Sequence, residues 1–287
     1  MHRFRQNLAH LYMVLFLVFL LAPLVVMSGA AFNDSKLPSI VPWRGFTTMW
    51  FSEMVQDQRM MLAFVNTLWV AVAVALVSVV VGTASAILIN SISGKVRTVL
   101  YGLMISTILI PGVVIGISTM IFWTKMGNAL ETEFFLFNPG LHLSVLGQVS
   151  YIAAMVMLLV LARLQSFDSG LEEAALDLGA SHTQVMRRIL LPHLYPAIGA
   201  GAAVAFFQSI ENFNVTQFTR GGADTLTVYV FSQVRSGITP TINALAFLLI
   251  CVTLVLALIY EINRRRRARI EAEREAEARR AEEAMLL

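Results

Sequence analysis

Residues 171–192 read LEEAALDLGASHTQVMRRILLP and connect two long apolar runs of the chain. Leucine and alanine recur in the first half at helical spacing, which predicts a short helix. Ser169, followed three residues later by Glu172, has the spacing of a capping box at the start of that helix. Gly179 suits the left-handed position that closes a helix, so we expect the first helix to end there.

A second short helix is expected directly after this glycine. Ser181 and Gln184 repeat the capping-box spacing, and Val185 and Ile189 continue the apolar pattern at helical spacing. Pro192 has no backbone N–H group, so we expect it to end the second helix and to reset the chain for the next apolar run.

The surface of the first helix suits contact with another protein. Ala174 and Ala175 are small and would let a partner approach the backbone, while Glu172, Glu173 and Asp177 offer negative charge to a basic surface. An amphipathic helix lying on the membrane surface is the alternative. A DNA-binding helix-turn-helix has the same outline, but the apolar runs that tether both ends argue against it.

The rest of the chain has the composition of a membrane protein. Hydrophobic residues make up 57% of the 287 positions and charged residues 14%, whereas soluble domains have about 25% charged residues. A spanning helix needs about 20 apolar residues. Six segments meet this requirement and predict an all-α, polytopic membrane helix bundle: Leu11–Phe32, Met61–Ile89, Val99–Lys125, Val145–Leu164, Leu194–Phe213 and Ile242–Ile262.

Two of these spans have special features. The third contains Pro111, Gly112 and Gly116, and we expect it to be interrupted there. The first has a basic start and a stretch of small residues, as a signal peptide does. Its apolar run exceeds the usual length of about 7–15 residues in signal peptides, which favours an uncleaved span.

Basic residues predict the orientation of the spans. They gather before the first span, between spans two and three, between spans four and five, and after the last span. The positive-inside rule therefore places both termini in the cytoplasm. Arginine and glutamate alternate in the last segment, which predicts a solvated helix. Three parts are expected: 1–60 with the first span and a periplasmic loop, 61–262 as a core that includes a cytoplasmic loop at 166–192, and 263–287 as a charged cytoplasmic helix.

Polar residues gather where the fifth span ends. Such groups are costly at membrane depth and usually face a protein interior or a water-filled path. Glu211 could attract an ammonium group, and Phe213 could offer a cation–π face. The alternative is that this stretch is only the polar outer end of the span. The predicted solute pathway consists of Gln208, Ser209, Glu211, Asn212, Phe213 and Asn214.

The loop between spans four and five resembles a known motif. Its pattern of Glu173-Ala174-Ala175, Gly179, Ile189 and Leu191-Pro192 is similar to the EAA loop of permeases from binding-protein-dependent ABC importers. The resemblance implies the type I importer fold, in which this loop forms a coupling helix that docks on an ATPase subunit. The implied coupling residues are Glu172, Glu173, Ala174, Ala175, Asp177, Gly179, Ile189, Leu191 and Pro192.

Further stretches resemble the spermidine/putrescine permease subfamily. Phe32–Ser35 and Trp43–Phe51 are similar to its first periplasmic loop, and Leu226–Val234 with Gly237–Ala246 to its last one. The resemblance implies a second, related permease subunit, a pair of cytoplasmic ATPases and a periplasmic solute-binding protein. It also implies the lipid bilayer of a bacterial inner membrane as the location and a polyamine or related amine as the solute. The subfamily has two adjacent aspartates where Glu211-Asn212 stand, so a mono-cation, a zwitterion or another amine-bearing solute stays an alternative.

Other functions have less support in the sequence. The chain has no Gly-rich P-loop followed by Lys and Ser or Thr, so it cannot bind ATP by that route. Its five histidines and single cysteine are scattered. We therefore expect a non-enzymatic subunit without cofactor, metal or nucleic acid. An ion-gradient-driven secondary transporter or channel is the main alternative, although it leaves the helix pair unexplained. A membrane scaffold assembled through small-residue faces such as Gly112-x-x-x-Gly116 is another.

Overall fold

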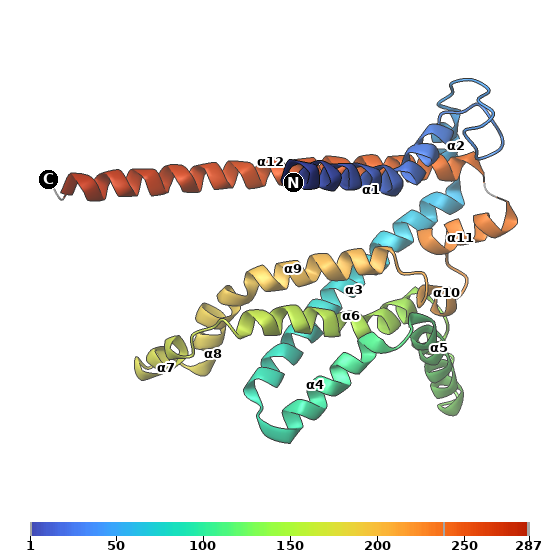
Figure 1. Cartoon of the computed structure of the whole chain (residues 1–287). Helices are drawn as coiled ribbons and strands as arrows, with labels where there is room; N and C mark the ends of the chain where they lie inside the picture. Colours follow the sequence, from blue (N-terminus) through green and yellow to red (C-terminus); the bar gives the residue numbers. More distant parts are fainter. Residues whose placement is uncertain (1, 238, 286–287) are drawn as a thin grey trace. The chain divides into compact units, whose positions relative to one another are not determined.

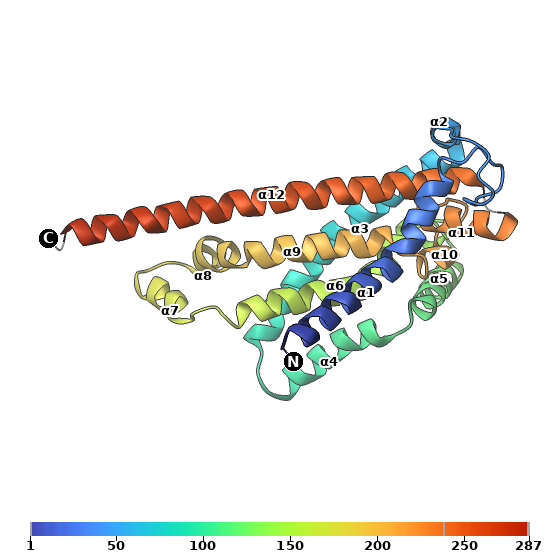
Figure 2. The same ribbon diagram turned by 45° about the horizontal axis from the view of Figure 1, so that its top comes forward.

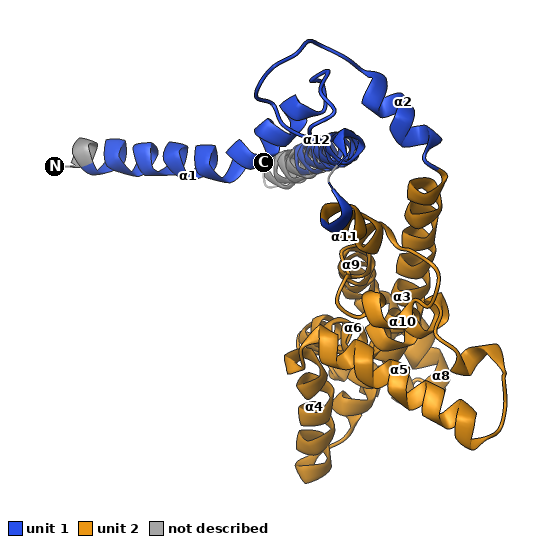
Figure 3. Ribbon diagram, turned by 90° about the vertical axis from the view of Figure 1, so that its right-hand side faces the viewer, with its two compact units in different colours: residues 1–57, 235–287 blue, residues 58–234 orange. Residues whose placement is uncertain are grey.

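The computed structural model describes residues 2–237 and 239–285, and these residues form helices and their connections. The chain divides into two compact units (Figure 3). Residues 1–57 and 235–287 belong to the first unit, and residues 58–234 to the second. Five helices are long and apolar enough to cross a membrane, or six if one bent pair counts as a single span, within the part of the chain that is described.

The first unit is built from α1 (His2–Ala30), α2 (Met49–Gln56) and α12 (Pro240–Met285) (Figure 1). α12 packs against both α1 and α2. The mean hydropathy is 2.6 for the apolar part of α1 and 2.8 for that of α12. α12 continues without a break into the charged C-terminal segment, where Glu261 forms ion pairs with Arg264 and Arg265. The helix expected there is confirmed, and it is an extension of the last span.

Asn33 organises the loop between α1 and α2. Its side-chain amide donates to two loop carbonyls and its Oδ1 atom accepts from the backbone N–H of Arg44 at 2.8 Å. The indole of Trp50 donates to the Asn33 carbonyl at 2.8 Å. This loop contains the first stretch that resembles the polyamine permease subfamily, and its buried Asn33 finds all of these partners within the unit. An aromatic cluster beside it joins Phe32 to Phe46, Phe51 and Phe247.

Three long helices form the core of the second unit. They are α3 (Gln58–Ser91), α6 (Leu141–Leu164) and α9 (Leu191–Ile210), and each contacts the other two (Figure 1). α4 (Gly94–Leu109) packs on α6. The core is apolar and consists mainly of β-branched residues and leucines. Its fully buried members include Val70, Val74, Ile152, Val156, Val160 and Leu194.

The third predicted span is broken, as expected, at Pro111. α4 ends at Leu109 and α5 (Gly112–Ala129) begins after Pro111, with an angle of 105° between the two helices. Proline cannot donate the backbone hydrogen bond that would continue α4. The interruption expected at Gly116 is wrong, because Gly116 lies inside α5 and is buried there. A 3₁₀ turn, η1 (Phe135–Phe137), and the short helices α10 (Thr216–Thr219) and α11 (Leu226–Ser236) complete the chain around these helices.

Candidate functional sites: a helix pair and a polar cavity

The predicted helix pair lies where α6 ends and α9 begins (Figure 2). Its first helix is α7 (Gly170–Asp177), and Gly179 follows it with φ +86°. The backbone N–H of Ala180 donates to the carbonyl of Ala175, and the N–H of Gly179 donates to that of Leu176. This pair of bonds is a Schellman motif, which fixes the turn after the helix. The left-handed role predicted for Gly179 is confirmed.

The capping box predicted at the start of α7 is wrong. The Ser169 side chain makes no capping hydrogen bond, and its backbone is already helical. Asp168 accepts from the backbone N–H of Gly170 at 2.9 Å instead. An aspartate one residue earlier competes for the same orphan N–H groups and satisfies one of them. The sequence spacing alone did not distinguish these two acceptors.

The second helix begins as predicted and ends differently. α8 (His182–Val185) starts with a complete capping box between Ser181 and Gln184. A π-helical turn, η2 (Met186–Leu190), then leads directly into α9, so the end expected at Pro192 is wrong. The wider π turn accommodates a residue that lacks an N–H group, and Pro192 takes an early position of α9 where that group is not needed.

The candidate coupling residues are accessible. None of the residues of α7, all of which are described, is buried. Glu173, Ala174, Asp177 and Gly179 are exposed, as is Pro192. The remaining candidates, Glu172, Ala175, Ile189 and Leu191, are half-buried. Leu178 is 90% exposed in the same loop. The sequence analysis did not predict it as a coupling residue, although a leucine next to the glycine that ends the helix could have indicated an exposed apolar contact.

The predicted pathway residues surround one cavity. Its volume is about 270 Å³, and it lies beside the connection between α9 and α10. Tyr151 lies 13 residues before the end of α6, which places the cavity about 20 Å along the helix axis from the start of the loop that contains α7. Five of the six predicted residues line the cavity: Gln208, Glu211, Asn212, Phe213 and Asn214. The other lining residues are Ile108, Ile110, Gly112, Ile115, Tyr151 and Met155.

Ser209 is not among the cavity-lining residues. It is buried and donates to the side-chain oxygen of Gln148 on α6 at 2.6 Å. The amide of Gln148 donates in turn to the hydroxyl of Thr216 at 2.9 Å. The hydroxyls of Ser144 and Thr219 form a parallel link at 2.9 Å. These buried bonds tie the end of α9 and the short helix α10 to α6, and therefore fix the segment that carries Glu211.

Glycines let this segment approach two other helices closely. A Cβ atom on Gly116 of α5 would lie 2.9 Å from the carbonyl oxygen of Val215, and one on Gly147 of α6 would lie 2.7 Å from the Val215 side chain. A Cβ atom on Gly112 would meet Asn214 at 3.0 Å. The small-residue face at Gly112 and Gly116 therefore packs against the pathway segment of the same chain.

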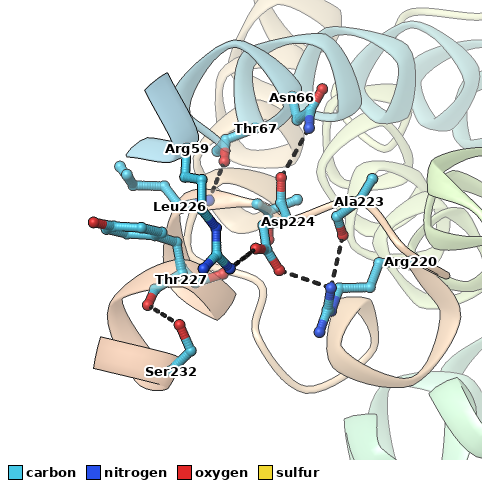
Figure 4. Close-up of polar contacts among 11 residues, drawn as sticks. Arg59, Asn66, Thr67, Arg220, Ala223, Asp224, Leu226, Thr227 and Ser232 are labelled. Atoms are coloured by element: carbon cyan, nitrogen blue, oxygen red, sulfur yellow. Dashed lines mark hydrogen bonds and ion pairs between the residues drawn. The ribbon is translucent and has the colours of Figure 1, made fainter. Parts of the chain in front are cut away.

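An ion-paired cluster holds the other end of the segment (Figure 4). Asp224 accepts from Arg220 at 2.7 Å and from Arg59 of α3 at 3.0 Å. The side chain of Asn66 donates to the Asp224 carbonyl at 2.9 Å, and the N–H of Leu226 donates to the hydroxyl of Thr67 at 2.7 Å. The connection between α10 and α11 is thus fastened to the first turns of α3.

A broken-helix bundle with a polar cavity beside the break is the architecture of a multi-span membrane transport protein. The comparisons with known proteins identify the family. Residues 78–269 match the family model described as the binding-protein-dependent transport system inner membrane component. The putrescine transport system permease protein PotI of Escherichia coli K12 is 33% identical over 81% of this chain and 82% of its own length. The spermidine/putrescine permease protein PotC of the same strain is 27% identical over 88% of this chain and 92% of its own.

The solved structures agree with this result at the level of the fold. One chain of a bacterial ABC transporter involved in the import of the acidic polysaccharide alginate superposes with a TM-score of 0.71 and 20% identity. The match covers 90% of this chain and 94% of that one. The chain therefore belongs to the family of binding-protein-dependent transport system inner membrane components and is a permease subunit of an ABC importer. The importer fold predicted from the sequence is confirmed. The family assignment replaces the alternative prediction of an ion-gradient-driven transporter.

Proposed function

We propose that this permease moves an amine-bearing cation, a polyamine first of all, through the cavity beside Glu211. The observation that carries the proposal is the cavity lining. It combines one carboxylate with the aromatic ring of Phe213 and the amides of Gln208 and Asn214. A carboxylate and a ring face attract an ammonium group, and amide oxygens replace its hydrogen bonds to water. PotI and PotC, both similar to this chain, are polyamine permeases by name.

The proposed importer requires further subunits in addition to this permease. A second permease subunit would complete the pathway, a periplasmic binding protein would deliver the solute, and a pair of ATPases would hydrolyse ATP. The exposed α7 would dock on an ATPase, with its acidic side chains and Leu178 at the contact. This arrangement requires both termini and α7 in the cytoplasm, and the basic residues near the ends of the spans support it.

Replacing the carboxylate tests the solute part of the proposal. Glu211→Gln keeps the shape of the side chain and removes its charge, so the KM for putrescine uptake by the assembled importer in proteoliposomes should rise about tenfold, equivalent to about 1.4 kcal/mol. Glu133→Gln is the matched control, because Glu133 is exposed and outside the cavity lining. Unchanged uptake kinetics in Glu211→Gln would remove this residue from the pathway.

Two substitutions test the coupling part. Glu173→Arg reverses a charge on the exposed face of α7, and Gly179→Asp introduces a side chain at a left-handed position. Both variants should insert into the membrane normally, retain ATPase activity and lose solute uptake. Glu133→Arg serves as the control for the added charge. Normal uptake by both coupling variants would show that α7 does not transmit work from the ATPase.

The orientation has an independent test. Single cysteines at Ala174 and at Arg59, introduced after replacing the native Cys251 by alanine, can be labelled from either side of the membrane. Labelling of position 174 only from the cytoplasm and of position 59 only from the periplasm is expected. The reverse pattern would overturn the proposed topology.

A further inference from the structure

Tyr151 is the polar cavity residue that the sequence did not single out. It lies on α6, whereas the other polar lining residues come from the end of α9 and the connection after it. It is half-buried, and it faces the same cavity as Glu211. Tyr151 brings an aromatic ring and a hydroxyl group to the cavity from a helix that carries none of the predicted pathway residues. Its contacts show which of these two groups already has a partner within the protein.

The hydroxyl of Tyr151 forms a hydrogen bond with Asn212. The side-chain N–H of Asn212 donates to the Tyr151 hydroxyl, and the Asn212 Oδ1 atom accepts from the backbone N–H of Val215 at 3.1 Å. Asn212 is 9% exposed, and both ends of its amide are occupied within the protein. Each end of the amide keeps one hydrogen-bonding position, but the residue is buried, so a solute has little access to it. Asn212 therefore holds the ring of Tyr151 at a fixed place next to residue 211.

Among the described residues, the ring of Tyr151 has no aromatic partner that would occupy it. Of the two aromatic rings in the cavity wall, that of Phe213 packs against Phe231 with 4.6 Å between centroids. The ring of Tyr151 stacks on no other aromatic ring within the part of the chain that is described. Tyr151 packs on one side against the apolar core of the second unit and also lines the cavity together with Glu211. A ring that is held in place beside a carboxylate is the arrangement that attracts an organic cation.

From this geometry we infer that Tyr151 is a specificity-determining residue, whose ring binds the ammonium group of the solute together with Glu211, and that Asn212 is a positioning residue. The inference rests on the proposed import of an amine cation and assigns its binding site more closely. The carboxylate of Glu211 and the ring of Tyr151 contribute differently to solute binding. The carboxylate attracts any cation, and the ring favours a weakly hydrated organic ammonium over a small, strongly hydrated ion.

Ring-retaining and ring-removing variants test the assignment in the assembled importer. Tyr151→Leu removes the ring, and the KM for putrescine should rise about 5- to 30-fold, which corresponds to the usual range of a partly to fully desolvated cation–π contact. Tyr151→Phe and Tyr151→Trp keep a ring but lose the hydroxyl that accepts from Asn212. Their KM should therefore rise only several-fold, as in Asn212→Leu, and less than that of Tyr151→Leu. The maximal uptake rate and the ATPase activity should change little in all three variants. Tyr195→Leu is the matched control, because Tyr195 lies on α9, is 61% exposed and is not part of the cavity lining.

The positioning role of Asn212 has its own readout. Asn212→Leu should raise the KM several-fold in the presence of Tyr151 and have little further effect in Tyr151→Leu, because a residue that acts through the ring cannot matter once the ring is gone. Independent, additive effects of the two substitutions would overturn this part.

The outcomes separate the inference from the proposed function. A raised KM in Glu211→Gln together with a wild-type KM in Tyr151→Leu would overturn the role of Tyr151 and leave the amine proposal standing. Loss of maximal rate for every solute at an unchanged KM would assign Tyr151 a structural role only. Failure of the wild-type importer to move putrescine, spermidine or any simple monoamine would overturn the proposed function, and the inference would fall with it.

Discussion

Asp224 is the shared partner of two arginines, and the structure predicts unequal importance for them. Its side chain is 19% exposed and that of Arg220 23%, whereas the side chain of Arg59 is 71% exposed. The pair with Arg220 is therefore largely shielded from water, and the Nε atom of Arg220 is buried without a partner among the described residues. The pair with Arg59 is screened by solvent on the arginine side.

The magnitudes follow from these exposures. A hydrogen bond between largely shielded charged groups contributes about 1.5–3 kcal/mol, so Arg220→Gln should destabilise the second unit by about 2 kcal/mol. An exposed ion pair contributes about 0.2–1 kcal/mol, so Arg59→Gln should cost less than about 1 kcal/mol. Asp224→Asn removes both attractions and leaves two guanidinium groups side by side. It should therefore be the most destabilising of the three, at about 2–3 kcal/mol.

Unfolding in mixed micelles with a rising fraction of SDS can measure these differences, followed by the fluorescence of Trp69 and Trp123 in the second unit. The effect of Arg59→Gln should shrink further at high salt, since exposed charges are screened within about 10 Å at 0.1 M ionic strength. The effect of Arg220→Gln should depend little on salt. Equal destabilisation by the two arginine substitutions, or a larger one for Arg59→Gln, would refute the reasoning from exposure.

Two further predictions concern the segment between α9 and α10. Gly116→Ala places a Cβ atom 2.9 Å from the carbonyl oxygen of Val215, and such overpacking should cost about 1–3 kcal/mol and reduce uptake, as measured in the same two assays. Gly102→Ala on α4, where no atom lies within 4 Å of the added Cβ, should leave uptake unchanged, and reduced uptake in both variants would contradict the packing argument. Gln148→Leu removes two buried hydrogen bonds and should cost about 1–3 kcal/mol in micelle unfolding, with Ser150→Ala as the near-neutral control on the same helix. A Gln148→Leu variant as stable as the wild type would show that this network does not hold α9 to α6.

The sequence determined the features that depend on a few neighbouring residues. The apolar spans, the break at Pro111, the left-handed Gly179 and the capping box of Ser181 with Gln184 are all present. Each follows from local backbone chemistry, such as a missing N–H group or a hydrogen bond three residues along the chain. The pattern at residues 173–192 also identified the family, because its residue types and spacing are specific.

Local patterns were wrong where two solutions compete within a few residues. Ser169 and Asp168 could both cap α7, and the aspartate makes the observed bond. Pro192 could end a helix or begin one, and the π turn before it allows α9 to begin without a break. The sequence spacing is the same in either case, so the outcome depends on how the neighbouring turn is packed.

Only the tertiary structure decided which polar residues line the cavity and which hold it in place. Ser209 and Asn212 have partners 61 residues away on α6, and these partners exist only because α6 and α9 pack at one particular rotation about their axes. Tyr151 came to the cavity wall for the same reason. A sequence records that a side chain is polar at membrane depth. The choice between contacting a solute and anchoring a helix is made by the neighbour that the fold brings within hydrogen-bonding distance.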